Sequence, residues 1–234
     1  MFQVTIMLDQ ATATALLKSG YRLYAFKAVR NSDLAGQVLV WFGSDLIGPR
    51  FVIAWNAAYA AYVTRSQQDP PEIDATFPIA SGQTLSITDP LGTGSVLRTG
   101  QPGAITIQNN SDVPFRAGIA QGIGGGPAPQ PLNAFPLYGN SVQVITPVER
   151  ILLAFSTRAW QPGQAVDSLA APSPASNAQH AGTGALLVDM DGAGEMGRSV
   201  AFDINRGWDW GAANWGQSIP VTASLAAVLI LPDA

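Results

Sequence analysis

Half of the six tryptophans lie within eight residues, in the segment WDWGAANW that begins at Trp208. Flat indole rings can stack on a sugar ring, while carboxylate and amide groups beside them bond to its hydroxyls. In an extended strand, the first two indoles would point to the same face. The candidate ligand-binding residues are Trp208, Asp209, Trp210, Asn214 and Trp215. Such aromatic residues also suit a lipid headgroup region, a core edge or a subunit contact, and these alternatives stay open.

The other chemically capable residues form no recognisable catalytic or metal-binding pattern. The acidic segment Asp189–Glu195 has glycine at its fourth position and glutamate at its seventh, whereas a calcium loop needs them at the sixth and twelfth. His180 is the only histidine and the chain has no cysteine, which argues against a zinc site, a cysteine nucleophile and a histidine-based triad. We therefore expect no catalytic residue, no metal and no cofactor, and a protein that is not an enzyme.

A hydrolase with paired carboxylates is the remaining enzymatic alternative. The 16 acidic residues are spread thinly, mostly at turns or near the ends of predicted strands. Turn chemistry accounts for these positions, because Asp side chains bond to nearby backbone amides there. Pairing of two carboxylates in three dimensions stays open at this point.

The composition points to contact with another surface. Charged residues make up 12% of the 234-residue chain and hydrophobic residues 47%, with a net charge of −4. That charged fraction is about half of the usual quarter for a soluble domain. The surface must consist of backbone, amides, hydroxyls and small apolar side chains, which suits self-association. The 12 Lys and Arg residues are scattered, so nucleic acid is not expected as a partner.

The elements that would position these residues are mostly strands. Asp9 as N-cap, good helix formers over residues 11–18 and Gly20 as a stop predict one short helix. Short apolar segments punctuated by Gly and Pro predict an all-β fold, a β-sandwich or jelly-roll-like arrangement with one short N-terminal helix. A small barrel is the alternative. The predicted strands are residues 2–8, 21–29, 38–42, 51–55, 57–64, 84–88, 104–109, 115–121, 142–146, 150–156, 185–189, 200–204 and 219–231.

The polar stretch at residues 66–72 (SQQDPPE) is the best candidate boundary within the chain. It would divide the chain into an N-terminal β-rich segment, 1–66, and a β-sandwich domain, 73–234, although one continuous domain stays open. The run from Ile105 to Gln121 contains an Asn/Asp turn between two strands and predicts a hairpin. The segments 122–131 and 166–184, rich in Gly, Pro, Ala and Ser, are predicted loops.

No apolar stretch reaches the roughly 18 to 20 residues that cross a bilayer, and the N-terminus lacks the basic start of a Sec signal. We expect a cytoplasmic location or export without such a signal. The sequence favours a non-enzymatic β-sandwich that associates with itself, as a structural or assembly subunit of a shell, tube or capsid. The alternative is a glycan- or membrane-binding module, lectin-like or membrane-active, that uses the Trp-rich loop.

Overall fold

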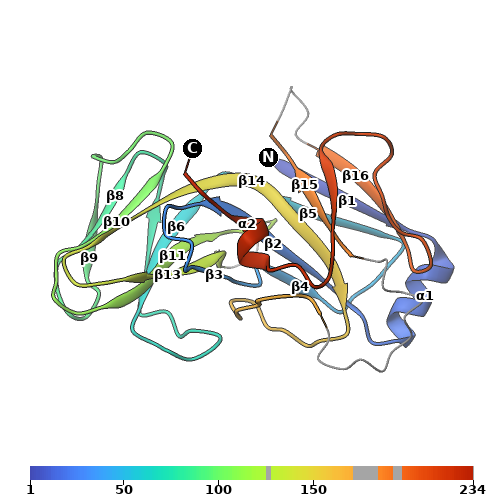
Figure 1. The fold of residues 1–234 in the computed structure, drawn as a ribbon, viewed down its shortest axis with the longest axis horizontal. Coiled ribbons are helices and arrows are strands. Elements are labelled where there is room, and N and C mark those ends of the chain that lie inside the picture. Colours follow the sequence, from blue (N-terminus) through green and yellow to red (C-terminus); the bar gives the residue numbers. More distant parts are fainter. Residues whose placement is uncertain (125–127, 171–183, 192–196, 234) are drawn as a thin grey trace.

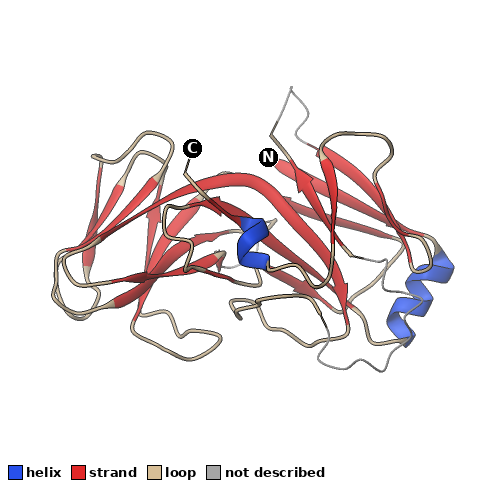
Figure 2. Cartoon of the chain, viewed as in Figure 1, coloured by secondary structure: helices blue, strands red, loops and turns tan. Residues whose placement is uncertain are grey.

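The computed structural model describes residues 1–124, 128–170, 184–191 and 197–233. About half of the chain (49%) is in strands and 7% is helical. Figure 2 shows strands throughout the molecule. The described residues form two helices. The structure confirms the predicted all-β sandwich with a short N-terminal helix.

The elements follow one another along the chain with few long connections. In order they are β1 (Phe2–Leu8), α1 (Gln10–Lys18), β2 (Arg22–Arg30), β3 (Gln37–Val38), β4 (Phe42–Ser44), β5 (Arg50–Trp55), β6 (Tyr59–Thr64), β7 (Ala75–Ile79), β8 (Thr84–Ile87), β9 (Gly94–Leu97), β10 (Ile105–Asn109), β11 (Phe115–Gln121), β12 (Gln130–Pro131), β13 (Asn133–Leu137), β14 (Val142–Ser156), β15 (Ala185–Asp189), β16 (Gly197–Asp203), β17 (Gly207–Asp209), β18 (Gly216–Ile219), α2 (Leu225–Leu229) and β19 (Ile230–Leu231).

Within the described residues these strands form three sheets. The four-stranded sheet has the order β17-β16-β1-β5, and the six-stranded sheet has the order β3-β13-β11-β6-β7 with β12 beside β11. The nine-stranded sheet has the order β18-β15-β14-β10-β8-β9, with β2, β4 and β19 paired off that path. Figure 1 shows β8, β9 and β10 at one end of the molecule, and α1, β1 and β16 at the other.

Strand β14 joins the two ends. Its first residues pair with β10, and its last residues pair with β15 and β2. The register against β2 shifts between Pro147 and Ile151, where three residues of β14 face the single residue Ala28. The sequence predicted two strands here, 142–146 and 150–156. They are one strand with a bulge, which lets it bend across the whole molecule (Figure 1).

Helix α1 begins and ends where local chemistry predicts. The Asp9 carboxylate accepts a hydrogen bond from the Thr12 amide at 2.6 Å, which satisfies one of the free donors of the first turn. The chain leaves the helix through Gly20, whose φ of +70° is a left-handed conformation that glycine adopts without strain. Ala13 and Leu16 are buried and anchor the helix to the core.

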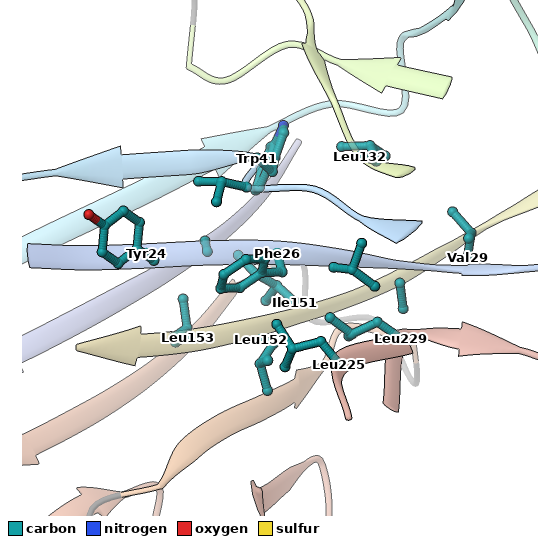
Figure 3. Close-up of a cluster of buried hydrophobic side chains, with 14 of the residues drawn as sticks. Tyr24, Phe26, Val29, Trp41, Leu132, Ile151, Leu152, Leu153, Leu225 and Leu229 are labelled. Carbon is teal, nitrogen blue, oxygen red and sulfur yellow. The ribbon is translucent and has the colours of Figure 1, made fainter. Parts of the chain in front are cut away.

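The predicted continuous strand at residues 219–231 is wrong, because the short helix α2 lies in the middle of it and only its ends, in β18 and β19, are extended. Pro220 has no amide hydrogen for a sheet ladder, and the Ser224 hydroxyl accepts a hydrogen bond from the Ala227 amide as a helix cap. Leu225 and Leu229, one turn apart, are both buried. Figure 3 shows them beside Leu152 of β14, so the helix covers the core with one apolar face.

The predicted hairpin at residues 105–121 is also wrong. Its strands, β10 and β11, form as expected but belong to different sheets. The buried Asn109 side chain donates to the carbonyl oxygens of Val113 and Tyr138, at 2.8 and 3.0 Å. These bonds hold the connection as an arch from one sheet to the other, a form that turn residues alone do not distinguish from a hairpin.

Further strands also escaped the sequence patterns, among them β7, β9, β12, β13, β17 and most of β18. Strands β7 and β13 contain Pro78 and Pro136, residues that argue against a strand when read locally, and β9 has only four residues. The predicted strand at 38–42 is divided between β3 and β4. The buried Leu39, Val40 and Trp41 lie between those two strands.

Strands from both sides of residues 66–72 occur in every sheet. For example, β6 pairs with β11, β1 pairs with β16, and β2 pairs with β14. The segment itself is tied down, since the Ala165 amide donates to the Asp69 carboxylate at 2.7 Å. A division into domains 1–66 and 73–234 stays a prediction, beside the alternative of one continuous domain.

Candidate functional site

Trp208 lies at the edge of the core, on β17. Its ring stacks on Phe155, with centroids 5.5 Å apart, and meets the edge of Phe202 at 4.9 Å. Its indole N–H donates to the Gly184 carbonyl oxygen at 3.0 Å. These three contacts fix the orientation of a half-buried indole and hold β17 against the core.

The other predicted tryptophans lie elsewhere. Strand β17 ends at Asp209, so Trp210 follows the strand, and its indole N–H donates to the Ala213 carbonyl oxygen at 3.2 Å. Trp215 lies under the Arg198 guanidinium, 5.2 Å from the ring centroid. Asn214 and Trp215 line a hollow of about 190 Å³ that does not include Trp208. Four of the five candidate residues therefore divide between two places, Asn214 and Trp215 at this hollow and Trp208 and Asp209 at another pocket, and Trp210 lines neither.

Trp208 and Asp209 share a larger pocket, which we call the β17 pocket. It encloses about 550 Å³, within the range of roughly 300–1,000 Å³ that small-molecule sites occupy. The ends of β1 and β16 form one side, and the β16–β17 turn and β17 form the other. Its lining includes Met7, Asp9, Asp203, Arg206, Trp208 and Asp209.

Backbone amides hold the three carboxylates of this pocket in place. Asp203 accepts hydrogen bonds from the amides of Asn205 and Arg206, at 2.8 and 2.9 Å, and forms an ion pair with the Arg206 guanidinium. Asp209 Oδ1 accepts from the Gly211 amide at 2.9 Å, and Asp9 caps α1. The bond from the Asn205 amide, with those from Arg206, lowers the pKa of Asp203. Its carboxylate therefore stays charged well into the acidic range.

This arrangement supplies charged acceptors for a ligand, and Asp203 does not have the properties of a general acid. The structure does gather three carboxylates around one pocket, which the sequence left open. A general acid, however, needs a raised pKa so that it carries a proton at working pH. The pKa of Asp203 is shifted the opposite way. Charged acceptors beside an indole and a methionine side chain can bind a hydroxylated ring without reacting with it.

A second polar site, absent from the sequence predictions, lies inside the molecule. We call Lys27, Trp55, Tyr59 and Glu149 the junction cluster. The Glu149 carboxylate accepts three hydrogen bonds, from Lys27 Nζ at 2.7 Å, Trp55 Nε1 at 2.8 Å and the Tyr59 hydroxyl at 2.6 Å. The donors come from β2, β5 and β6, which belong to three different sheets. One carboxylate, on the bulge of β14, thus ties all three sheets together.

Burial governs the electrostatics of the junction cluster. The Lys27 side chain is 1% exposed, and burial lowers its pKa despite the adjacent carboxylate. Its ammonium lies 4.4 Å from the Trp55 ring centroid, a favourable cation–π distance. Burial would raise the pKa of Glu149, but Lys27 and the two neutral donors outweigh it and lower that pKa. Burial and the neighbouring carboxylate raise the pKa of Tyr59, so its hydroxyl remains a donor.

Two local signals could have pointed to this cluster. Lys27 is the charged residue inside an otherwise apolar run, YAFKAV, and a buried lysine requires a partner. Glu149 follows Pro147, between two predicted strands, where a bulge can turn a side chain inward. Neither signal names the partner, because 122 residues separate Lys27 from Glu149.

The structure describes only part of the acidic segment Asp189–Glu195 and does not describe the histidine. His180, Gly192 and Glu195 lie outside the described residues. The described residues contain no group of three or more His, Cys, Asp and Glu placed to hold a metal ion. In the same part of the chain, no helix has the length and apolar character needed to cross a membrane.

Comparison of the chain with known protein families, with curated proteins and with solved structures finds no match.

Proposed function

We propose that this protein is a lectin-like binding module that takes a neutral sugar in the β17 pocket. The observation that carries the proposal is the pocket itself, which places the half-buried Trp208 beside charged side chains held by backbone amides. Rigid acceptors and an apolar wall are what recognition of a hydroxylated ring requires, since the ligand then loses little by fitting them.

The charges of the pocket favour a neutral ligand over an acidic one. Of the described residues, Asp9, Asp203 and Asp209 line it with a single cation, Arg206, which is already paired with Asp203. An anionic sugar or a phosphate headgroup would meet two further carboxylates. A neutral sugar instead donates its hydroxyls to carboxylate oxygens, and such charge-assisted hydrogen bonds are the stronger ones.

Replacing Asp209 with asparagine is expected to weaken sugar binding about tenfold or more, because a hydrogen bond to a charged group is lost. The purified protein is titrated with glucose, galactose, mannose and N-acetylglucosamine, and binding of each sugar is measured by saturation-transfer NMR. Asp209→Asn keeps the size of the side chain, and its amide oxygen can still accept from Gly211.

Asp112→Asn is the matched control, because Asp112 is an exposed turn residue that does not line the pocket. It should bind sugars as the parent protein does. Equal loss in both variants, or no saturation transfer from any of the four sugars, would overturn the proposal. Binding to phosphatidylcholine vesicles without binding to sugars would instead support the membrane-binding alternative.

Self-association is the second candidate function, and one surface favours it. Val4, Ile6 and Leu8 of β1 point into the core, so Thr5 and Met7 point outward from the four-stranded sheet. Across the sheet, Thr5 is paired with Val52 and Ser199, and Met7 with Ala201. Met7 is 43% exposed and Val52 45%. Arg50, which pairs with Met7, and Asp209, which pairs with Ala201, are charged residues at the two edges of this face. The uncharged area between them, around Val52, could lie against the same area of a second copy.

Val52→Glu tests the second candidate, because it would place a carboxylate in the middle of that contact. Val52 does not line the β17 pocket, although Met7 and Ala201 of the same face do. If the protein self-associates through this face, light scattering should show an oligomer for the parent and a smaller particle for the variant. Leu46→Glu is the control, since Leu46 is 78% exposed in a loop away from the sheet. A monomeric parent protein, or an unchanged oligomer in Val52→Glu, would exclude this contact.

A further inference from the structure

A second pocket lies at the outer face of the six-stranded sheet, and we call it the Arg116 pocket. It encloses about 450 Å³. Gln37 of β3, Arg116 of β11 and Pro136 of β13 come from the sheet, and Gln67, Pro114 and Tyr138 from the connections around it. Neither the predicted ligand residues nor the β17 pocket contributes to this lining.

The charge of this pocket is opposite to that of the β17 pocket. Among the described residues that line it, Arg116 is the one that carries a charge. Within the described part of the chain, Arg116 forms no salt bridge. Asp33 lies two residues before Ala35, another lining residue. Its carboxylate oxygens accept hydrogen bonds from the Ala35 amide and the Gln143 side chain. An uncompensated guanidinium in a protein of net charge −4 attracts an anion.

The guanidinium contacts one neighbouring side chain. Arg116 Nη2 donates to the Gln37 side-chain oxygen, and the two residues lie on opposite sides of β13. The bond therefore reaches across that strand, where Ala134 pairs with Gln37 and Pro136 pairs with Arg116. This contact occupies one of the five guanidinium donors. The others remain for a planar acceptor, and a carboxylate matches their fork geometry.

The rest of the lining suits a ring with hydroxyls. Tyr138 is 67% exposed, and the rings of Pro114 and Pro136 provide further apolar surface in the pocket. Gln37 and Gln67 carry side-chain amides that can donate to hydroxyl oxygens. We propose that the Arg116 pocket binds a carboxylate on a hydroxylated ring, such as a uronic acid, with the carboxylate on Arg116 and the ring against Tyr138.

Glucuronate and glucose form a matched pair of probes, because they differ by a carboxylate in place of a hydroxymethyl group. Each probe is titrated into the protein while the amide chemical shifts are recorded by NMR. Glucuronate should shift the amide signals of residues around Arg116 and Tyr138, and glucose should not. Acetate tests the carboxylate alone and should bind more weakly than glucuronate. Equal shifts from glucose and glucuronate at this pocket would overturn the proposal, and so would the absence of any shift.

Arg116→Met is expected to weaken glucuronate binding about tenfold or more, because the charged fork is removed while its aliphatic part is kept. Arg98→Met, at an exposed position outside the pocket, should bind as the parent does. If both variants lose binding equally, the attraction is unspecific and the proposal fails.

Gln37→Glu is a second variant, which should fold as the parent protein does. It places a carboxylate against Arg116 in the ligand-free protein. That internal carboxylate should exclude glucuronate while thermal unfolding stays unchanged. Unchanged glucuronate binding in Gln37→Glu would contradict the assigned site. Asp209→Asn, which tests the β17 pocket, should leave glucuronate binding intact, so the two proposals can fail separately.

Discussion

Replacing Glu149 with alanine is expected to lower the free energy of unfolding by about 3–5 kcal/mol, because it leaves the Lys27 ammonium buried without its partner. The Lys27 side chain is 1% exposed, so its ammonium has little contact with water that could compensate for the lost carboxylate. The substitution also leaves the Trp55 indole N–H and the Tyr59 hydroxyl without their acceptor. Urea denaturation of the parent and the variant measures the difference.

Removing Lys27 instead of Glu149 should lower the free energy of unfolding by less. Lys27→Met keeps the length of the side chain and leaves Glu149 with its two neutral donors, and that carboxylate is 13% exposed. We expect a loss of about 1–2 kcal/mol. The double variant, Lys27→Met with Glu149→Ala, removes the stranded charge and should be more stable than Glu149→Ala alone. A double variant whose loss equals the sum of the single losses would contradict coupling within the junction cluster.

Gly118→Ala is expected to destabilise the protein by about 3 kcal/mol or more, since the added methyl group meets a backbone atom that cannot move independently. Gly118 lies within β11, between β6 and β13. A Cβ there would overlap the Asn133 carbonyl oxygen and lie 2.8 Å from Cε1 of Tyr62. Tyr62 is itself fully buried, with its hydroxyl bonded to the same Asn133 oxygen at 2.5 Å.

Gly122→Ala is the matched control for that experiment. Gly122 follows the same strand, and a Cβ added to it meets nothing within 4 Å. Its substitution should change stability by less than about 1 kcal/mol, with a small gain from the less flexible unfolded chain. Similar midpoints of thermal unfolding for the two variants would show that the close approach at Gly118 does not restrict the strand.

The two strongest local predictions succeeded because their causes lie within a few residues. Helix α1 depends on Asp9, the good helix formers over residues 11–18 and a glycine, all in one short segment. Strand β11 has the bounds that its apolar sequence predicts. By contrast, β14 was predicted as two strands, because a bulge at Glu149 looks like an interruption until the partner strand is known. The last apolar run was read as a strand, although Pro220 and Ser224 favour the helix that forms there.

At the candidate sites, local sequence indicated some of the residues but not those that complete the pocket. The tryptophan-rich segment directed attention to Trp208 and Asp209, yet the rest of the β17 pocket comes from Met7, Asp9 and the β16–β17 turn. Nothing near Arg116 in the sequence indicates Gln37, which lies 79 residues away. A local pattern identifies residue types that can bind, but not the residues that complete the pocket.

By itself, the sequence determined the all-β class, the capped helix, the surface poor in charge and the absence of cysteine. These properties follow from local conformational preferences and composition, which do not depend on partners. Only the tertiary structure decided that β10 and β11 separate into two sheets and that Glu149 meets Lys27, Trp55 and Tyr59. Such contacts depend on which distant segments pair, and that is set by the packing of the whole core rather than by any one segment.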